Sequence, residues 1–90
     1  MAEKMTVTVE MSAAGADALG ARIDDEPLKF KDGKASRDVE AGIHFLQYFV
    51  LGPPGTTYRI AITSPAQSKW ERKGAVPGDG LTAGSKKFVV

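Results

Sequence analysis

The sequence has no cysteine, one histidine and an almost balanced charge, and each of these scarcities excludes a class of function. Without cysteine, the chain has no disulfide framework, no thiolate metal site and no cysteine nucleophile. A net charge of +1 gives no electrostatic field strong enough to imply nucleic acid or an anionic membrane surface as a partner. We therefore expect no cofactor and no nucleic-acid partner.

Long apolar runs are absent as well. None approaches the roughly 18 residues that a membrane-spanning helix needs, so we expect no membrane span. Residues 1–11 also lack the apolar segment of a signal peptide. As written, the chain is expected to be cytoplasmic, whereas removal of a signal peptide before position 1 would make it periplasmic or extracellular.

With 90 residues, the chain is expected to form one domain, residues 1–90. A domain of this size buries only about 60 to 65% of the surface that its unfolded chain exposes, so its core is small. An enclosed active site therefore has little room.

The strongest pattern lies in residues 42–62. Residues 43–51 are apolar or aromatic except at His44 and Gln47, and residues 58–63 alternate between large apolar side chains and others. Between them stands a Gly-Pro-Pro-Gly turn at residues 52–55. The pattern predicts two strands joined as a central hairpin.

Further strand signals are short. Alternation and turn residues predict strands at 5–11, 19–24, 28–31, 35–40 and 86–90, with 35–40 a weak edge strand. Gly33 suits the positive φ of a hairpin-type turn after 28–31. Residues 66–84, with Pro77, several glycines and few apolar side chains, predict a long irregular loop.

Six or seven short strands without an amphipathic helix predict an all-β sandwich. The run Val-Glu-Ala-Gly-Ile-His-Phe-Leu-Gln-Tyr at residues 39–48 resembles the corner of immunoglobulin-like domains, where an Asp/Glu-Ala-Gly-X-aromatic segment passes between sheets. His44 stands where that corner usually has tyrosine. The resemblance covers about half the chain and implies an immunoglobulin-like antiparallel β-sandwich of six to seven strands.

Three motifs have weak chemical interpretations. Residues 52–56 are similar to the start of a phosphate-binding loop, but the required Gly-Lys-Ser/Thr ending is missing, which favours a hairpin loop. The acidic run 24–26 with Asp32 could supply oxygen ligands to calcium, although a solvated acidic turn is the usual explanation. His44 has no adjacent nucleophile, so a hydrogen bond to the backbone is favoured over a general-base role.

Residues 43–51 carry apolar side chains at both alternating sets of positions. The corner resemblance implies that His44, Leu46, Tyr48 and Val50 face the core, so that Ile43, Phe45, Phe49 and Leu51 point away. In the reversed register, Leu46, Tyr48 and Val50 would point away instead. An outward apolar patch indicates a covering loop, a self-interface or a ligand surface. The segment 66–84 is long enough to be that cover.

Trp70 lies among Lys69, Arg72 and Lys73 in the predicted loop. An aromatic ring between cations can stack on a sugar, a base or an anionic partner. The alternative, which the large area of the ring favours, is that Trp70 folds back to cap one end of the core.

Together these patterns predict a non-enzymatic binding or interaction module, part of a larger bacterial surface or secreted system. It would recognise a protein partner or small ligand through a sheet face around Phe45 and Phe49, with Arg59 at the edge and Trp70 as a mobile aromatic. Two alternatives remain open. One is a structural, self-associating homodimer, and the other is a carbohydrate-binding module that uses Trp70 and Tyr58.

Overall fold

A computed structural model describes residues 4–90, which form an all-β fold. The first three residues of the predicted domain lie outside this description. The elements are β1 (Lys4–Ser12), β2 (Ala18–Ile23), β3 (Glu26–Pro27), β4 (Lys34–Glu40), β5 (Ile43–Leu51), β6 (Thr57–Ser64), the short 3-10 helix η1 (Ala66–Ser68), β7 (Trp70–Ala75) and β8 (Leu81–Val89).

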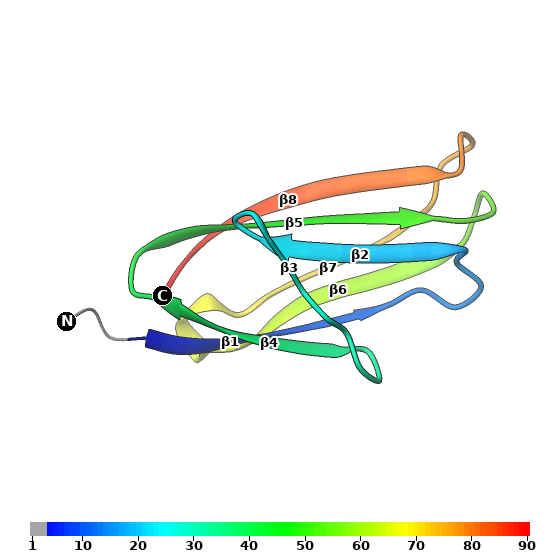
Figure 1. The fold of residues 1–90 in the computed structure, drawn as a ribbon. Coiled ribbons are helices and arrows are strands. Elements are labelled where there is room, and N and C mark those ends of the chain that lie inside the picture. Colours follow the sequence, from blue (N-terminus) through cyan, green and yellow to red (C-terminus); the bar gives the residue numbers. More distant parts are fainter. Residues whose placement is uncertain (1–3) are drawn as a thin grey trace.

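The strands form two four-stranded antiparallel sheets that face each other (Figure 1). The first sheet has the order β4-β1-β6-β7, and the second has the order β3-β2-β5-β8. Their inner faces share one apolar core, so the prediction of an all-β, sandwich-like architecture is confirmed. No helix within residues 4–90 is long and apolar enough to cross a membrane.

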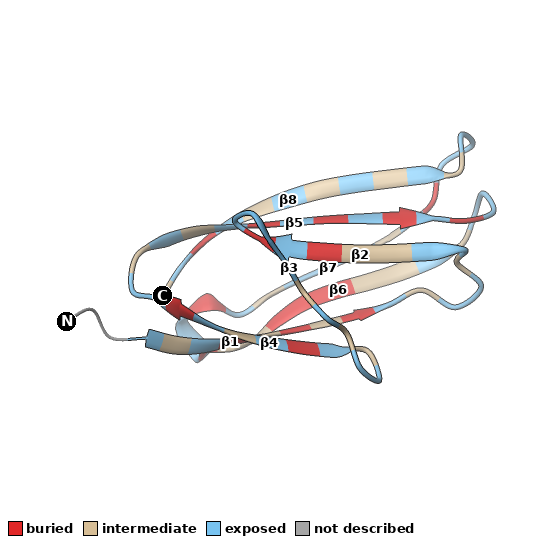
Figure 2. Ribbon diagram, in the orientation of Figure 1, coloured by how far each residue is buried: buried red, intermediate tan, exposed pale blue. Residues whose placement is uncertain are grey.

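The core follows from alternation along the strands, visible as regularly spaced buried residues (Figure 2). Each fully buried aliphatic side chain contributes about 1.5 to 3 kcal/mol relative to exposure. The largest of them come from both sheets: Val7, Val9, Ile60 and Ile62 from the first, and Ile23, Leu46 and Val50 from the second.

The predicted hairpin between residues 42 and 62 is wrong. β5 pairs with β2 and β8, whereas β6 pairs with β1 and β7, so the chain changes sheets between them. The Gly-Pro-Pro-Gly segment instead pairs with the loop before β8: Gly52 N donates to Gly80 O at 3.0 Å, and Gly55 N donates to Val76 O at 2.8 Å. Pro53 and Pro54 have no N–H to contribute to a strand ladder, which suits a crossover.

The predicted loop at 66–84 is also wrong, because it contains η1, β7 and the first part of β8. Local composition hid these strands, since glycines stand where large side chains would mark a buried face. Gly74 lies opposite Tyr58 and Gly84 opposite Tyr48, and in both pairs the tyrosine ring covers the glycine. The aromatic ring supplies the burial that the glycine cannot.

Of the shorter strands, those expected at 5–11, 19–24 and 35–40 are confirmed as β1, β2 and the edge strand β4. The strand expected at 86–90 is the end of the longer β8. The strand expected at 28–31 is wrong: apart from a bridge between Lys31 and Lys34, this segment is an irregular arm between the sheets. The turn after it does carry positive φ, 54° at Asp32 and 79° at Gly33.

Candidate binding face

The outer face of the second sheet carries the large apolar side chains that the fold leaves exposed. We call it the outer apolar face, and its exposed residues are Ile43, Phe45, Phe49 and Leu51 of β5 with Leu81 and Val89 of β8. Register places all of them on one side, because Ile43 is paired with Val89 and Leu51 with Leu81. Exposure is high, reaching 57% at Ile43 and 49% at Phe45.

The predicted orientation of residues 43–51 is confirmed. Leu46, Tyr48 and Val50 are buried and His44 is half-buried, while the odd-numbered residues are exposed. The predicted cover is wrong, because residues 70–75 belong to the first sheet and residues 81–84 extend the second sheet beside β5. Within residues 4–90, the face is open to solvent.

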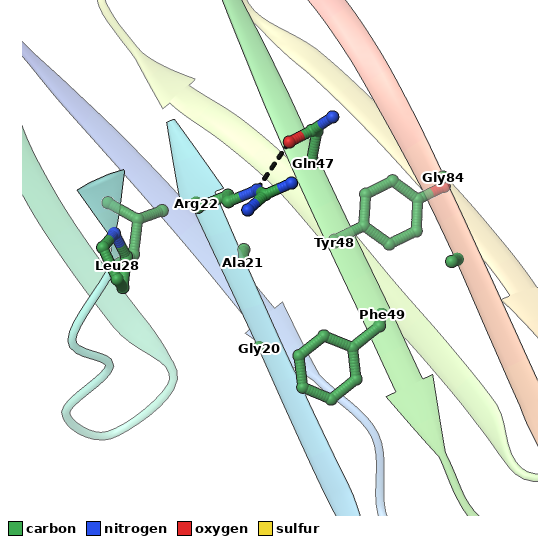
Figure 3. Close-up of a pocket in the computed structure, with 10 residues that line it drawn as sticks. Gly20, Ala21, Arg22, Leu28, Gln47, Tyr48, Phe49 and Gly84 are labelled. Atoms are coloured by element: carbon green, nitrogen blue, oxygen red, sulfur yellow. Dashed lines mark hydrogen bonds between the residues drawn. The ribbon is translucent and has the colours of Figure 1, made fainter. Parts of the chain in front are cut away.

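Polar and small residues divide this face. At its centre, Arg22 Nε donates to Gln47 Oε1 at 2.6 Å, and the Phe49 ring lies over Gly20 on the neighbouring strand (Figure 3). A Cβ at Gly20 would stand 2.7 Å from that ring, so the glycine permits the close approach. Beside the ring is an open hollow of about 500 Å³ whose lining includes Arg22, Gln47, Phe49 and Leu28.

Trp70 is the first residue of β7, so the expectation of a mobile aromatic on a loop is wrong. Its ring is half-buried against the core, with its centroid 6.4 Å from that of Tyr48. The Arg72 guanidinium lies 5.5 Å from the Trp70 ring centroid and donates to the Tyr48 hydroxyl at 3.0 Å. This position agrees with a cap on the core.

Arg59 was expected at the edge of the Phe45 and Phe49 face, and this placement is wrong. It lies in β6, in the first sheet, where its guanidinium forms an ion pair with Glu71. Of the predicted binding residues, Phe45 and Phe49 therefore share a face, whereas Arg59 and Trp70 lie in the other sheet.

Sequence reasoning missed the contributions of β2 and β8 to the outer apolar face. Leu81 and Val89 are eight positions apart, an even spacing that places both on one side of a strand. That spacing was the available signal, but the intervening Gly84 and lysines obscured it. Gly20 and Arg22 gave no comparable signal, because their importance depends on pairing with β5.

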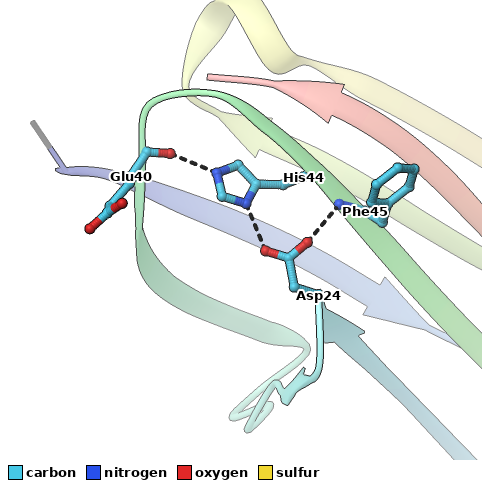
Figure 4. Close-up of polar contacts among 4 residues, drawn as sticks. All are labelled: Asp24, Glu40, His44 and Phe45. Atoms are coloured by element: carbon cyan, nitrogen blue, oxygen red, sulfur yellow. Dashed lines mark hydrogen bonds and ion pairs between the residues drawn. The ribbon is translucent and has the colours of Figure 1, made fainter. Parts of the chain in front are cut away.

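His44 holds the connection between β4 and β5 together (Figure 4). Its Nε2 lies 2.6 Å from the backbone oxygen of Glu40, and its Nδ1 lies 2.7 Å from Oδ2 of Asp24. Asp24 Oδ1 also accepts from Phe45 N at 3.1 Å. The predicted hydrogen bond from His44 to the backbone is thus confirmed.

Both partners of the His44 ring are acceptors, so this geometry suits the imidazolium form, which donates from both nitrogens. Burial lowers the pKa of His44, but the hydrogen bonds to Asp24 and Glu40 outweigh it and raise the pKa above its ordinary value. The bond from His44 in turn lowers the pKa of Asp24. In the part of the chain that the structure describes, no group of three His, Asp or Glu side chains is placed to hold a metal ion.

Inward-pointing cations protect the long edge strands. β4, β7 and β8 each carry one on the inner side, since register places Arg37, Arg72 and Lys86 opposite the buried Val7, Ile60 and Leu46. Adding another strand at such an edge would bury a charge, which opposes edge-to-edge pairing. The edges are therefore protected, while the outer apolar face is open.

Comparisons of the chain with protein-family models, curated protein sequences and solved structures gave no match. The functional argument therefore rests on the geometry described above. Its central feature is the outer apolar face, which is large, open and distinct from the protected edges.

Proposed function

We propose that this chain is a non-enzymatic interaction module that binds a protein partner through its outer apolar face. One observation carries the proposal: the exposed large apolar side chains of residues 4–90 all lie on this face. Soluble proteins seldom leave several large apolar side chains exposed together on one sheet face without a binding role.

The shape of the face favours a protein over a small molecule. It extends along the two nine-residue strands β5 and β8, and the hollow beside Phe49 is open rather than enclosed. Small ligands bind in concave sites that bury most of their surface, whereas protein partners use broad faces with aromatic anchors. Phe45 and Phe49 are the proposed anchors.

We also propose that the fold is immunoglobulin-like. The His44 bond to Glu40 O reproduces the backbone bond of a tyrosine corner, at the point where the chain passes from one sheet to the other. β5, which follows the corner, is central in its sheet. The departure is that β6 and β7 of the opposite sheet intervene in the chain between β5 and its neighbour β8.

A carbohydrate site that uses Tyr58 and Trp70 requires both rings exposed and coplanar. Both are half-buried against the core, and the Tyr58 ring covers Gly74. We do not propose this function. An enzymatic role for His44 is disfavoured, since both ring nitrogens already have partners.

The proposal is tested by selecting binders from a display library of genome fragments and comparing two variants. Phe45→Lys places a charge on the outer apolar face, while the matched control Thr6→Lys places one on the outer face of the first sheet, beside Asp38. A partner that binds the wild type and Thr6→Lys but not Phe45→Lys supports the proposal. Partners that bind Phe45→Lys as tightly as the wild type contradict it.

A further inference from the structure

We infer that the partner is a second copy of this chain, bound face to face about a two-fold axis that runs close to β5. This inference rests on the proposed function, because it uses the same outer apolar face. It comes from the order of side chains across β2, β5 and β8. When a second copy is rotated by 180° about an axis along β5, the side chains of the two copies that face each other are complementary.

The first complementary row contains Phe45. On one side Asp24 lies beside it, with Asp24 N donating to Phe45 O at 2.8 Å, and on the other side Lys87 is its register partner. Rotation about β5 exchanges the two sides, so Lys87 of each copy lies over the Asp24 position of the other. The Asp24 carboxylate already accepts from His44 and from Phe45 N, but its side chain is 46% exposed, so it can accept a further hydrogen bond from an ammonium group.

The next rows repeat this complementarity. Arg22 and Ser85 flank Gln47 on opposite sides, and Gly20 and Ala83 flank Phe49 in the same way. Rotation therefore places Arg22 over Ser85 of the second copy, and Gly20 over Ala83. The row of Gln47 pairs a cation with a hydroxyl that can accept from it. The row of Phe49 pairs small residues, which leaves space for the two Phe49 rings near the axis.

An axis that crosses the strands at Gln47 fits less well. It would bring Arg22 of one copy against Arg22 of the other, and like charges in a contact are unfavourable. An axis near the strand direction avoids this contact. It also agrees with the usual angle of about −30° between the strands of stacked sheets.

The size of the face indicates a reversible dimer. Three strands of which two have nine residues span about 30 Å by about 15 Å. That footprint corresponds to about 1,000 Å² of accessible surface for the two copies together, at the lower end of specific interfaces. We therefore expect dissociation in the micromolar range rather than an obligate dimer.

Sedimentation equilibrium over a wide concentration range tests the inference. The wild type is expected to form a reversible dimer, and Phe45→Lys is expected to raise the dissociation constant at least about 30-fold. Lys87→Glu, which opposes two carboxylates, is expected to raise it about fivefold. The matched control Lys69→Glu changes an exposed residue in the turn before β7 and is expected to behave as the wild type.

Circular dichroism checks that each variant is folded. If Phe45→Lys does not fold, Ile43→Lys takes its place, because Ile43 is more exposed, at 57%. A dimer that neither apolar-face variant weakens would overturn the inference.

The absence of native cysteine allows single-cysteine variants to locate the axis with a short bismaleimide cross-linker. Gln47→Cys lies on β5 and is expected to cross-link with itself. Ser85→Cys is expected to cross-link with Arg22→Cys when the two variants are mixed, but not with itself. Self-cross-linking of Ser85→Cys without the mixed product would overturn the proposed axis.

These experiments separate the inference from the proposed function. A wild type that stays monomeric at all concentrations overturns self-pairing. In that case, a library partner that binds Thr6→Lys but not Phe45→Lys still supports the proposed function. A monomeric wild type whose library partners bind Phe45→Lys as tightly as the wild type contradicts both the proposed function and self-pairing.

Discussion

The outer faces of the two sheets differ sharply although their inner faces form one core. On the first sheet, Thr6 donates to Asp38 at 2.6 Å, and the hydroxyls of Thr8 and Ser36 lie 3.1 Å apart. This is the polar surface expected of a solvated sheet. On the second sheet, the equivalent positions of β5 hold exposed isoleucine, phenylalanine and leucine.

The comparison indicates that the outer apolar residues are not part of the core that holds the two sheets together. The core is complete without them, since both sheets contribute fully buried side chains to it. Apolar residues that lie outside the core indicate a second requirement, which we propose to be binding.

The largest expected effect contrasts two adjacent residues of β5. Val50 is fully buried, whereas Phe49 is 40% exposed. Val50→Lys would bury an unpaired charge and is expected to cost at least about 4 kcal/mol of the free energy of unfolding, enough to unfold a domain of this size. Phe49→Lys is expected to remain folded. Urea unfolding followed by circular dichroism measures both, and loss of the fold in Phe49→Lys would mean that the outer face belongs to the core.

A second contrast uses glycines that lie under aromatic rings. A Cβ at Gly84 would stand 2.4 Å from the Tyr48 hydroxyl, inside the core, while one at Gly20 would stand 2.7 Å from the Phe49 ring on the outer face. Gly84→Ala is expected to cost about 1 to 3 kcal/mol, because Tyr48 is buried and cannot move away. Gly20→Ala is expected to cost less, since Phe49 can rotate into solvent. Equal losses in urea unfolding would show that the outer ring is held as rigidly as the inner one.

The third prediction concerns the corner that connects the sheets. The pKa of His44 is raised in the folded protein, so its stabilising contribution is present below its unfolded pKa of about 6.5 and is lost as pH rises through the folded value. The pKa of Asp24 is lowered, so its contribution is present above its unfolded pKa of about 3.9 and is lost as pH falls through the folded value. The bond between His44 and Asp24 is therefore expected to stabilise the fold most at pH values above about 3.9 and below about 6.5.

His44→Gln should remove the alkaline part of this dependence. At about pH 6 it is expected to cost about 1.5 to 3 kcal/mol, the usual value of hydrogen bonds to a charged group, with a smaller cost at about pH 9. Urea unfolding at both pH values measures the difference. A cost for His44→Gln that is the same at both would show that the imidazolium is not the form stabilised.

The smallest expected effect lies on the polar outer face. Arg59 and Glu71 form an exposed ion pair there, and such pairs contribute little to stability. Arg59→Gln is expected to leave the urea midpoint unchanged. A clear loss of stability would show that the polar face has a structural role which the comparison between the two outer faces does not include.

Local sequence patterns were sufficient where one strand carries the information. The alternation of residues 43–51 predicted two opposite faces of β5, because period-2 patterns depend only on the strand itself, and the resemblance to an immunoglobulin-like corner indicated which face is buried. The corner at Ala41 and Gly42 was expected from the same resemblance, and the bond from His44 to the backbone was predicted with it.

Pairing between strands could not be predicted in this way. β5 and β6 are adjacent in the chain and both strongly apolar, but they belong to different sheets. The Asp24 partner of His44 is 20 positions away, and the tyrosines that cover Gly74 and Gly84 are opposite them only through register. Such contacts depend on the whole topology, which explains why Arg59 and Trp70 were expected at the wrong sites.

The most direct test of the account is a map of which residues respond when the protein concentration is raised. Amide chemical shifts in ¹H–¹⁵N spectra, recorded on dilute and concentrated samples, give this map. The account predicts that the changes fall on β2, β5 and β8 and are largest around Phe45, Gln47 and Phe49. Changes confined to β1, β4, β6 and β7 would contradict it, because self-association would then use the polar sheet.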